Sequence, residues 1–220
     1  MPVFRIRKEF VSSNFEYGLE VDFQLESFSE YINITEELIE KEIKREIIKH
    51  DKFLKESSEY EIHAYYDAID HIIKTNVHQL YYNSLFISLY SFLEKKMYQF
   101  CKLAEKNYSI KVKDLSDDGI FKYQKYLKKV VGIDFEKLNT EWTQITKYNK
   151  LRNLLVHSPT TEIENIENFQ NQIKTLKSIE GLTFRDKGET IEFQINDKKL
   201  LRDFYKTISV FLHEIYCERD

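Results

Sequence analysis

The sequence has few of the residues that interrupt secondary structure, with only 5 glycines and 2 prolines in 220 residues. This scarcity argues against a turn-rich all-β fold and favours long, uninterrupted elements. The 2 cysteines are too few for a disulfide framework or a cysteine-based zinc site. No apolar run approaches the roughly 20 residues that a bilayer-spanning helix needs. We therefore expect a cytoplasmic protein that does not insert into a membrane.

Apolar residues are plentiful, at 42% with 15% aromatic, which is enough for a core of ordinary size. The net charge of −4 is distributed unevenly along the chain. Residues 1–70 carry 9 basic and 17 acidic side chains, a balance of −8, whereas residues 122–152 carry 8 basic and 3 acidic, a balance of +5. A polyanionic partner would bind the basic side of the molecule. The alternative is that both segments are solvated helix faces.

Hydrophobic periodicity divides the chain near residue 27. Leu19, Val21, Phe23 and Leu25 alternate with polar residues, a period of two that predicts paired antiparallel strands within residues 3–26. We expect residues 1–27 to form a β-like extension and residues 28–220 a helical domain, together one compact unit.

Beyond residue 28 the period is helical. Asn33 with Glu36 has the form of a capping box, which predicts a helix start. A hairpin is expected at residues 182–195, around a turn at 186–188. The expected helices cover approximately residues 33–54, 62–73, 79–108, 121–132, 134–157, 161–179 and 200–215. The expected fold class is mainly α, a helical bundle with a small antiparallel β-sheet or hairpins.

A short motif lies in "TKYNKLRNLLVHSPTTE", residues 146–162. Pro159 disfavours a helical conformation at Ser158, so the helix should end at His157. Arg152 and His157 would then lie about 140° apart around the helix and about 7.5 Å apart along it, while Asn153 and His157 share a face. Taken alone, the pattern also fits a histidine that merely caps a helix C-terminus.

The string Arg152-Asn153-Leu154-Leu155-Val156-His157 resembles the Arg-polar-x3-His signature of the HEPN superfamily. HEPN proteins are small α-helical bundles, many of them metal-independent endoribonucleases of toxin–antitoxin, CRISPR and anti-phage systems. The hydrophobic segment "SLYSFLEKK" is similar to an earlier core helix of these proteins. The resemblance covers residues 33–215 in helix order, and only the six-residue motif is specific. It implies a homodimer whose two motifs form one site, without a cofactor.

The chemistry that the resemblance implies assigns a role to each motif residue. His157 would transfer protons, Arg152 would hold the scissile phosphate, and Asn153 would orient the imidazole or contact the phosphate. Glu94 is a candidate supporting residue, because a carboxylate in an apolar helix needs a partner and Arg152 is one. The alternative for Glu94 is a pair with a lysine of its own helix.

Basic and aromatic side chains near the motif are candidates for RNA contacts. Tyr123 and Tyr126 would either stack on bases or pack in the core. The candidates for the RNA backbone are Lys147, Lys150, Lys125, Lys128 and Lys129, each of which has solvated surface as its alternative.

Other interpretations lead to different partners. An antitoxin or a component of a defence complex is a further expected partner. The alternative function is a non-catalytic HEPN scaffold that binds a nucleotide, a nucleic acid or a protein, and a simpler one is a helical interaction protein. His63, Asp67 and His71 are spaced so that one face of a helix could bind a metal ion. They also fit the solvent-exposed face of an amphipathic helix, so no metal is expected.

Overall fold

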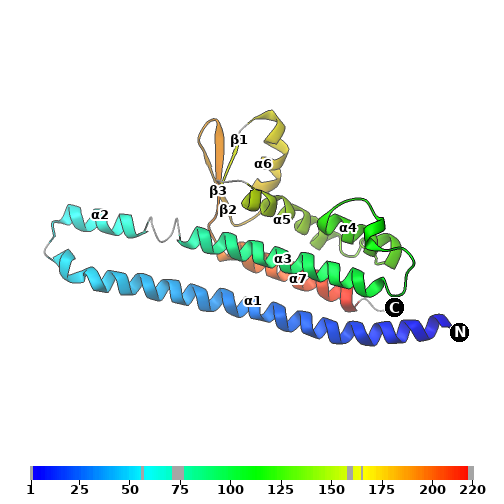
Figure 1. Cartoon of the computed structure of the whole chain (residues 1–220). Helices are drawn as coiled ribbons and strands as arrows, with labels where there is room; N and C mark the ends of the chain where they lie inside the picture. The colour runs from blue at the N-terminus through cyan, green and yellow to red at the C-terminus, as the bar shows by residue number, and fades with distance from the viewer. Residues whose placement is uncertain (1, 56, 71–76, 158–160, 165, 218–220) are drawn as a thin grey trace.

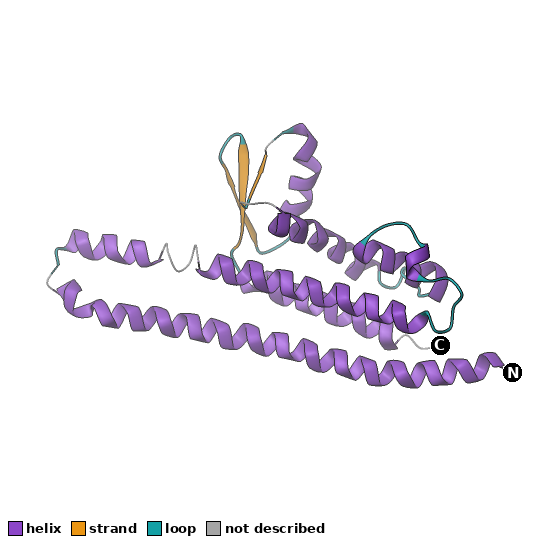
Figure 2. Cartoon of the chain, viewed as in Figure 1, coloured by secondary structure: helices purple, strands orange, loops and turns teal. Residues whose placement is uncertain are grey.

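The computed structural model describes residues 2–55, 57–70, 77–157, 161–164 and 166–217. This part of the chain is mainly helical with a small antiparallel sheet, which confirms the expected fold class (Figures 1 and 2). The α-helices are α1 (Pro2–Lys55), α2 (Glu59–Asp70), α3 (His78–Ala104), α4 (Gly119–Tyr126), α5 (Asn139–His157), α6 (Gln170–Lys177) and α7 (Lys198–Cys217). The strands are β1 (Glu162–Glu164), β2 (Leu182–Asp186) and β3 (Thr190–Ile195).

The N-terminal segment is helical, and the prediction of strands within residues 3–26 is wrong. Helix α1 runs from Pro2 to Lys55 and passes through both the boundary expected at residue 27 and the helix start expected at Asn33. Val21 and Leu25 are buried, one helical turn apart, whereas Phe23 between them is 69% exposed. The alternating pattern therefore places apolar residues on two opposite faces of one helix.

The core lies among α3, α5 and α7, which pack against one another. Phe204 of α7 is fully buried, and its ring centroid lies 4.8 Å from that of Phe86 on α3 and 4.4 Å from that of Tyr148 on α5. Helix α3 is apolar around most of its circumference, as expected for the central helix. These aromatic contacts fix α5, and with it the motif, against α3.

Helix α1 extends along the bundle and packs mainly on α7 (Figure 1). Polar contacts hold the two helices in register. Asn33 Oδ1 accepts a hydrogen bond from Arg202 Nη2 at 3.2 Å, and Glu36 Oε2 pairs with Lys198 Nζ at 3.1 Å. The residue expected to cap a helix thus bonds to another helix instead.

The sheet has the order β1-β3-β2, and both pairings are antiparallel. Strands β2 and β3 confirm the expected hairpin, whose turn contains Gly188 at φ +86°. The helix start expected at Thr161 is wrong, because residues 162–164 form β1 and α6 begins only at Gln170. Ile163 lies opposite Ile191 in the pairing and is buried, which favours the strand.

The start of α5 is held by an aromatic cluster. Trp142 stacks on Phe211 of α7 at 5.9 Å between centroids, and it makes edge contacts with Phe121 at 6.0 Å and Phe135 at 5.7 Å. Gly132, at φ +87°, ends the short π-helix Leu127–Val131 that follows α4, where the helix expected over residues 121–132 also stops. The cluster fixes α4 and α7 against the first turn of α5.

Candidate functional site

The motif lies on the last two turns of α5, which ends at His157 as predicted. Ile145, Tyr148 and Leu151 form the buried side of this helix. Arg152 is half-buried beside them, and Asn153 and His157 are exposed. Burial of one face therefore leaves the polar motif residues on the boundary and outer side of the helix.

Arg152 is held in place by neighbouring side chains of α3 and α5. Its Cζ lies 5.6 Å from the centroid of the Tyr90 ring on α3, a cation–π contact. Its Nη1 donates a hydrogen bond to Asn153 Oδ1 at 3.1 Å. Within the described part of the chain, no carboxylate forms an ion pair with Arg152, and its buried Nε has no hydrogen-bond partner. The guanidinium charge is therefore available to an anion.

Tyr90 belongs to the candidate site and was not predicted from the sequence. Its side chain is almost fully buried, and its hydroxyl accepts a hydrogen bond from Asn149 Nδ2. Asn149 Oδ1 in turn accepts from Asn153 Nδ2 at 3.4 Å, and Asn153 contacts Arg152. A tyrosine in an otherwise apolar helix needs a hydroxyl partner, and that signal could have identified it.

Burial raises the pKa of Tyr90 to about 12, against the opposing effects of the Asn149 hydrogen bond and the Arg152 charge. The nearby carboxylate of Glu94 acts in the same direction as burial. Tyr90 therefore stays protonated at neutral pH, and its ring and hydroxyl form a fixed support for the motif.

Glu94 lies one turn after Tyr90 on α3 and is half-buried. Its Oε1 is 2.9 Å from the position that a Cβ would take on Gly119, so it contacts the first residue of α4. Among the described residues it forms no ion pair with Arg152 or with a lysine of α3. Neither the pair with Arg152 nor the pair with a lysine of α3 is therefore present among the described residues. The two charges still meet at Tyr90, whose pKa Glu94 raises and Arg152 lowers.

His157 is the exposed end of the motif. Val156 beside it is 42% exposed, and no described residue forms a hydrogen bond with the imidazole. Arg152 and His157 leave the helix in directions about 140° apart. The structure therefore does not bring the two side chains together within one chain.

Two of the candidate lysines bind other parts of the chain. Lys125 Nζ contacts Ser116 Oγ and Asp117 Oδ2, both at 2.7 Å, and so fixes the loop before α4. Lys150 Nζ donates to Thr175 Oγ1 at 3.2 Å. These contacts give both lysines a structural role at the surface.

The remaining candidates differ in exposure. Lys128 and Lys129 are exposed on the π-helix, and Lys147 is half-buried on α5. Tyr126 is fully buried, with its O–H donated to Ile110 O at 3.0 Å, so it packs in the core. The role of the lysines in RNA binding stays a prediction.

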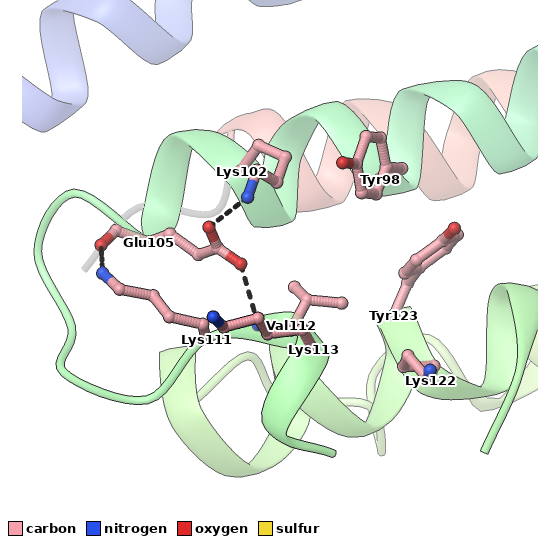
Figure 3. Close-up of a pocket in the computed structure, with 8 residues that line it drawn as sticks. All are labelled: Tyr98, Lys102, Glu105, Lys111, Val112, Lys113, Lys122 and Tyr123. Carbon is pink, nitrogen blue, oxygen red and sulfur yellow. Dashed lines mark hydrogen bonds and ion pairs between the residues drawn. The ribbon is translucent and has the colours of Figure 1, made fainter. Parts of the chain in front are cut away.

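A cleft of about 470 Å³ opens between the end of α3 and α4, which we call the α3–α4 cleft (Figure 3). Two tyrosines line one end, Tyr98 from α3 and Tyr123 from α4, with ring centroids 5.6 Å apart. The lysines around it are Lys102, Lys111, Lys113 and Lys122.

One carboxylate, Glu105, organises the wall of the cleft. It pairs with Lys102 Nζ and accepts a hydrogen bond from Val112 N at 2.8 Å. Burial alone would raise the pKa of the Glu105 carboxyl, but the bonds from Lys102 and Val112 outweigh it and hold the pKa below its usual value. Glu105 is therefore a charged, structural member of the wall.

No group of three or more His, Cys, Asp or Glu side chains among the described residues is placed to hold a metal ion. His71, of the metal face considered above, lies outside the described residues. None of the described helices combines the length and apolarity needed to cross a membrane.

No family model, curated protein or solved structure matches the chain. Function is therefore inferred from the residues and the geometry of this chain.

Proposed function

We propose that this protein is a metal-independent endoribonuclease of the HEPN type that acts as a homodimer. The observation that carries the proposal is the combination on α5 of an arginine whose charge is unpaired within the described chain and an exposed histidine at the helix end. Both are the residue types that phosphodiester cleavage requires. The proposed setting, a toxin–antitoxin or anti-phage system, rests on the motif resemblance.

The proposed reaction uses the RNA itself as the nucleophile. The 2′-oxygen attacks the adjacent phosphorus while its proton passes to a base, and the bond from phosphorus to the 5′-oxygen breaks as that oxygen gains a proton. The products are a 2′,3′-cyclic phosphate and a 5′-hydroxyl. His157 would transfer the protons, and Arg152 would stabilise the charge on the pentavalent phosphorane.

A second subunit would complete the site. Arg152 and His157 of one chain lie about 7.5 Å apart along α5 and face different directions. Two-fold symmetry would place a second motif opposite the first, so that an arginine and a histidine approach one phosphate from different subunits. The exposed Val156 beside His157 would lie within such an interface.

Cleavage of RNA in the presence of EDTA tests the proposal. Wild type, Arg152→Ala and His157→Ala would be incubated with total RNA and with tRNA, after sedimentation and circular dichroism confirm a folded dimer. His63→Ala is the matched control, because His63 is also exposed but lies on α2. Cleavage by wild type and the control, but not by the motif variants, is the expected result.

A non-catalytic HEPN scaffold is the second candidate function, and the lysine-lined cleft favours it. If a folded wild-type dimer binds RNA or a nucleotide but leaves RNA intact, the scaffold replaces the nuclease. If the wild type is monomeric, or if both motif variants still cleave, the composite site at the motif is wrong.

A further inference from the structure

The α3–α4 cleft has an excess of positive charge, since four lysines line it against a single glutamate. Two of these lysines are occupied. Lys102 pairs with Glu105, and Lys111 Nζ donates to Tyr108 O at 2.9 Å and to Glu105 O. These three contacts close the turn after α3, so Lys102 and Lys111 maintain the shape of the cleft.

The other two lysines are available to a ligand. Lys113 has no hydrogen bond or ion pair from its ammonium to any described residue. Lys122 approaches Asp118 only at 3.8 Å, and Asp118 is fully exposed, so this pair is weak. The cleft thus contains two ammonium groups with no strong partner, which suit a phosphate.

The aromatic end of the cleft suits a flat ring. Tyr98 is 43% exposed, and its ring and that of Tyr123 are inclined at 50° to each other. The two rings therefore do not stack on each other, and a face of Tyr98 is open to a ligand. Figure 3 shows Tyr98 and Tyr123 together at one end of the cleft, with Lys122 beside Tyr123. Base–aromatic stacking needs such an open ring face.

We propose that the α3–α4 cleft binds a nucleotide unit, with the base stacked on Tyr98 and the phosphate held by Lys113 and Lys122. The volume of about 470 Å³ falls in the range of small-ligand sites. The unit is either a free nucleotide or one residue of an RNA strand, since both present a base and a phosphate. The proposal does not depend on RNA cleavage by the motif.

The cleft and Tyr90, which supports Arg152 of the motif, are on the same helix, α3. Tyr98 follows Tyr90 by eight residues, about 12 Å along α3. Glu94 lies midway, against α4. An RNA strand whose base occupies the cleft would therefore pass Arg152 within a few nucleotides.

Isothermal titration calorimetry tests the proposal on the full chain. AMP is the first probe, compared with adenosine, which lacks the phosphate, and with ribose 5-phosphate, which lacks the base. We expect saturable AMP binding, about tenfold weaker binding of each truncated probe, and loss of affinity with added salt. An eight-nucleotide RNA is then titrated into His157→Ala, which should leave the RNA intact. Tighter binding of this RNA than of AMP indicates a subsite for a strand, and weaker binding indicates a site for a free nucleotide.

Variants locate the binding. Tyr98→Ala and Lys122→Gln should each weaken AMP binding about tenfold, because each removes one of the two proposed contacts. Tyr60→Ala and Lys177→Gln are the controls, since these side chains are exposed on α2 and α6 and should leave the affinity unchanged. The proposal is overturned if neither AMP nor the RNA binds the folded chain, or if binding is unchanged in both cleft variants.

Discussion

The ring of Tyr90 lies beneath the guanidinium of Arg152, with 5.6 Å between Cζ and the ring centroid. Tyr90 lies on the central helix, sixty-two positions before Arg152 in the chain, and supports the arginine of the motif. The hydroxyl of the same tyrosine binds Asn149, which leads through Asn153 back to Arg152. One buried side chain therefore fixes Arg152 by two routes.

Replacing the Tyr90 hydroxyl should separate stability from activity. Tyr90→Phe keeps the ring under Arg152 but leaves Asn149 Nδ2 without its acceptor, at a cost of about 1 kcal/mol in the free energy of unfolding. Tyr126→Phe is the control, because it also removes one hydroxyl hydrogen bond, to Ile110 O, but Tyr126 lies on α4 and not beneath Arg152. Urea denaturation should show similar losses, whereas RNA cleavage should fall only in Tyr90→Phe. Equal cleavage by both variants would show that the Asn149 route does not position Arg152.

The contact between Glu94 and Gly119 can be tested with a single methyl group. Gly119→Ala places a Cβ 2.9 Å from Glu94 Oε1, at a φ of +54°. Gly188→Ala introduces the same methyl at φ +86° with no atom within 4 Å, so its cost is backbone strain alone, about 1 kcal/mol. Because Glu94 Oε1 is the end of a flexible side chain that can shift, we expect similar losses of thermal stability for Gly119→Ala and Gly188→Ala. A clearly larger loss for Gly119→Ala would mean that Glu94 is held firmly against α4.

Two neighbouring positions of α1 distinguish a helix from a strand. Leu25→Ala should lower the free energy of unfolding by about 2–5 kcal/mol, since Leu25 is 1% exposed. Phe23→Ala should change it by no more than about 0.5 kcal/mol, since Phe23 is 69% exposed. On a strand both side chains would share one face, and the two losses, measured by urea denaturation, would be alike.

Acid should open the turn after α3. The pKa of Glu105 lies below its ordinary value in the folded chain, so its ionised contacts stabilise the fold fully above the unfolded pKa, about 4.3. This contribution is lost as the pH falls through the lower, folded value. Urea midpoints measured from pH 3 to pH 6 should therefore decline less steeply in Glu105→Gln than in wild type. Parallel declines would exclude Glu105 as the titrating group.

The sequence predicted those helices whose apolar residues form one continuous face. It also predicted the end of a helix where a proline or a glycine marks it. Pro159 marked the end of α5, and Gly132 marked the end of the π-helix. The prediction failed for α1 because apolar residues on two faces of a helix imitate the alternation of a strand. It failed at Thr161 because the partner of β1 is β3, almost thirty residues away.

The candidate site was predictable only in part, for the same reason. Arg152, Asn153 and His157 lie within one stretch of six residues, so local spacing identified them. Tyr90 and the α3–α4 cleft depend on the way α3 packs against α5 and α4, and no local pattern contains that information. Glu94 was placed on the right helix, but its contact with Gly119 required the position of α4.

The aromatic cluster at the start of α5 gives the protein its own optical reporter. Trp142 is the single tryptophan of the chain, and it contacts Phe121 of α4, Phe135 before α5 and Phe211 of α7 at once. The emission of Trp142 therefore reports on the junction of α4, α5 and α7. Phe121, which contacts Trp142 there, immediately precedes Lys122 of the α3–α4 cleft. Spectral changes can be assigned to this junction without a label, and fluorescence from any bound protein that lacks tryptophan will not obscure them.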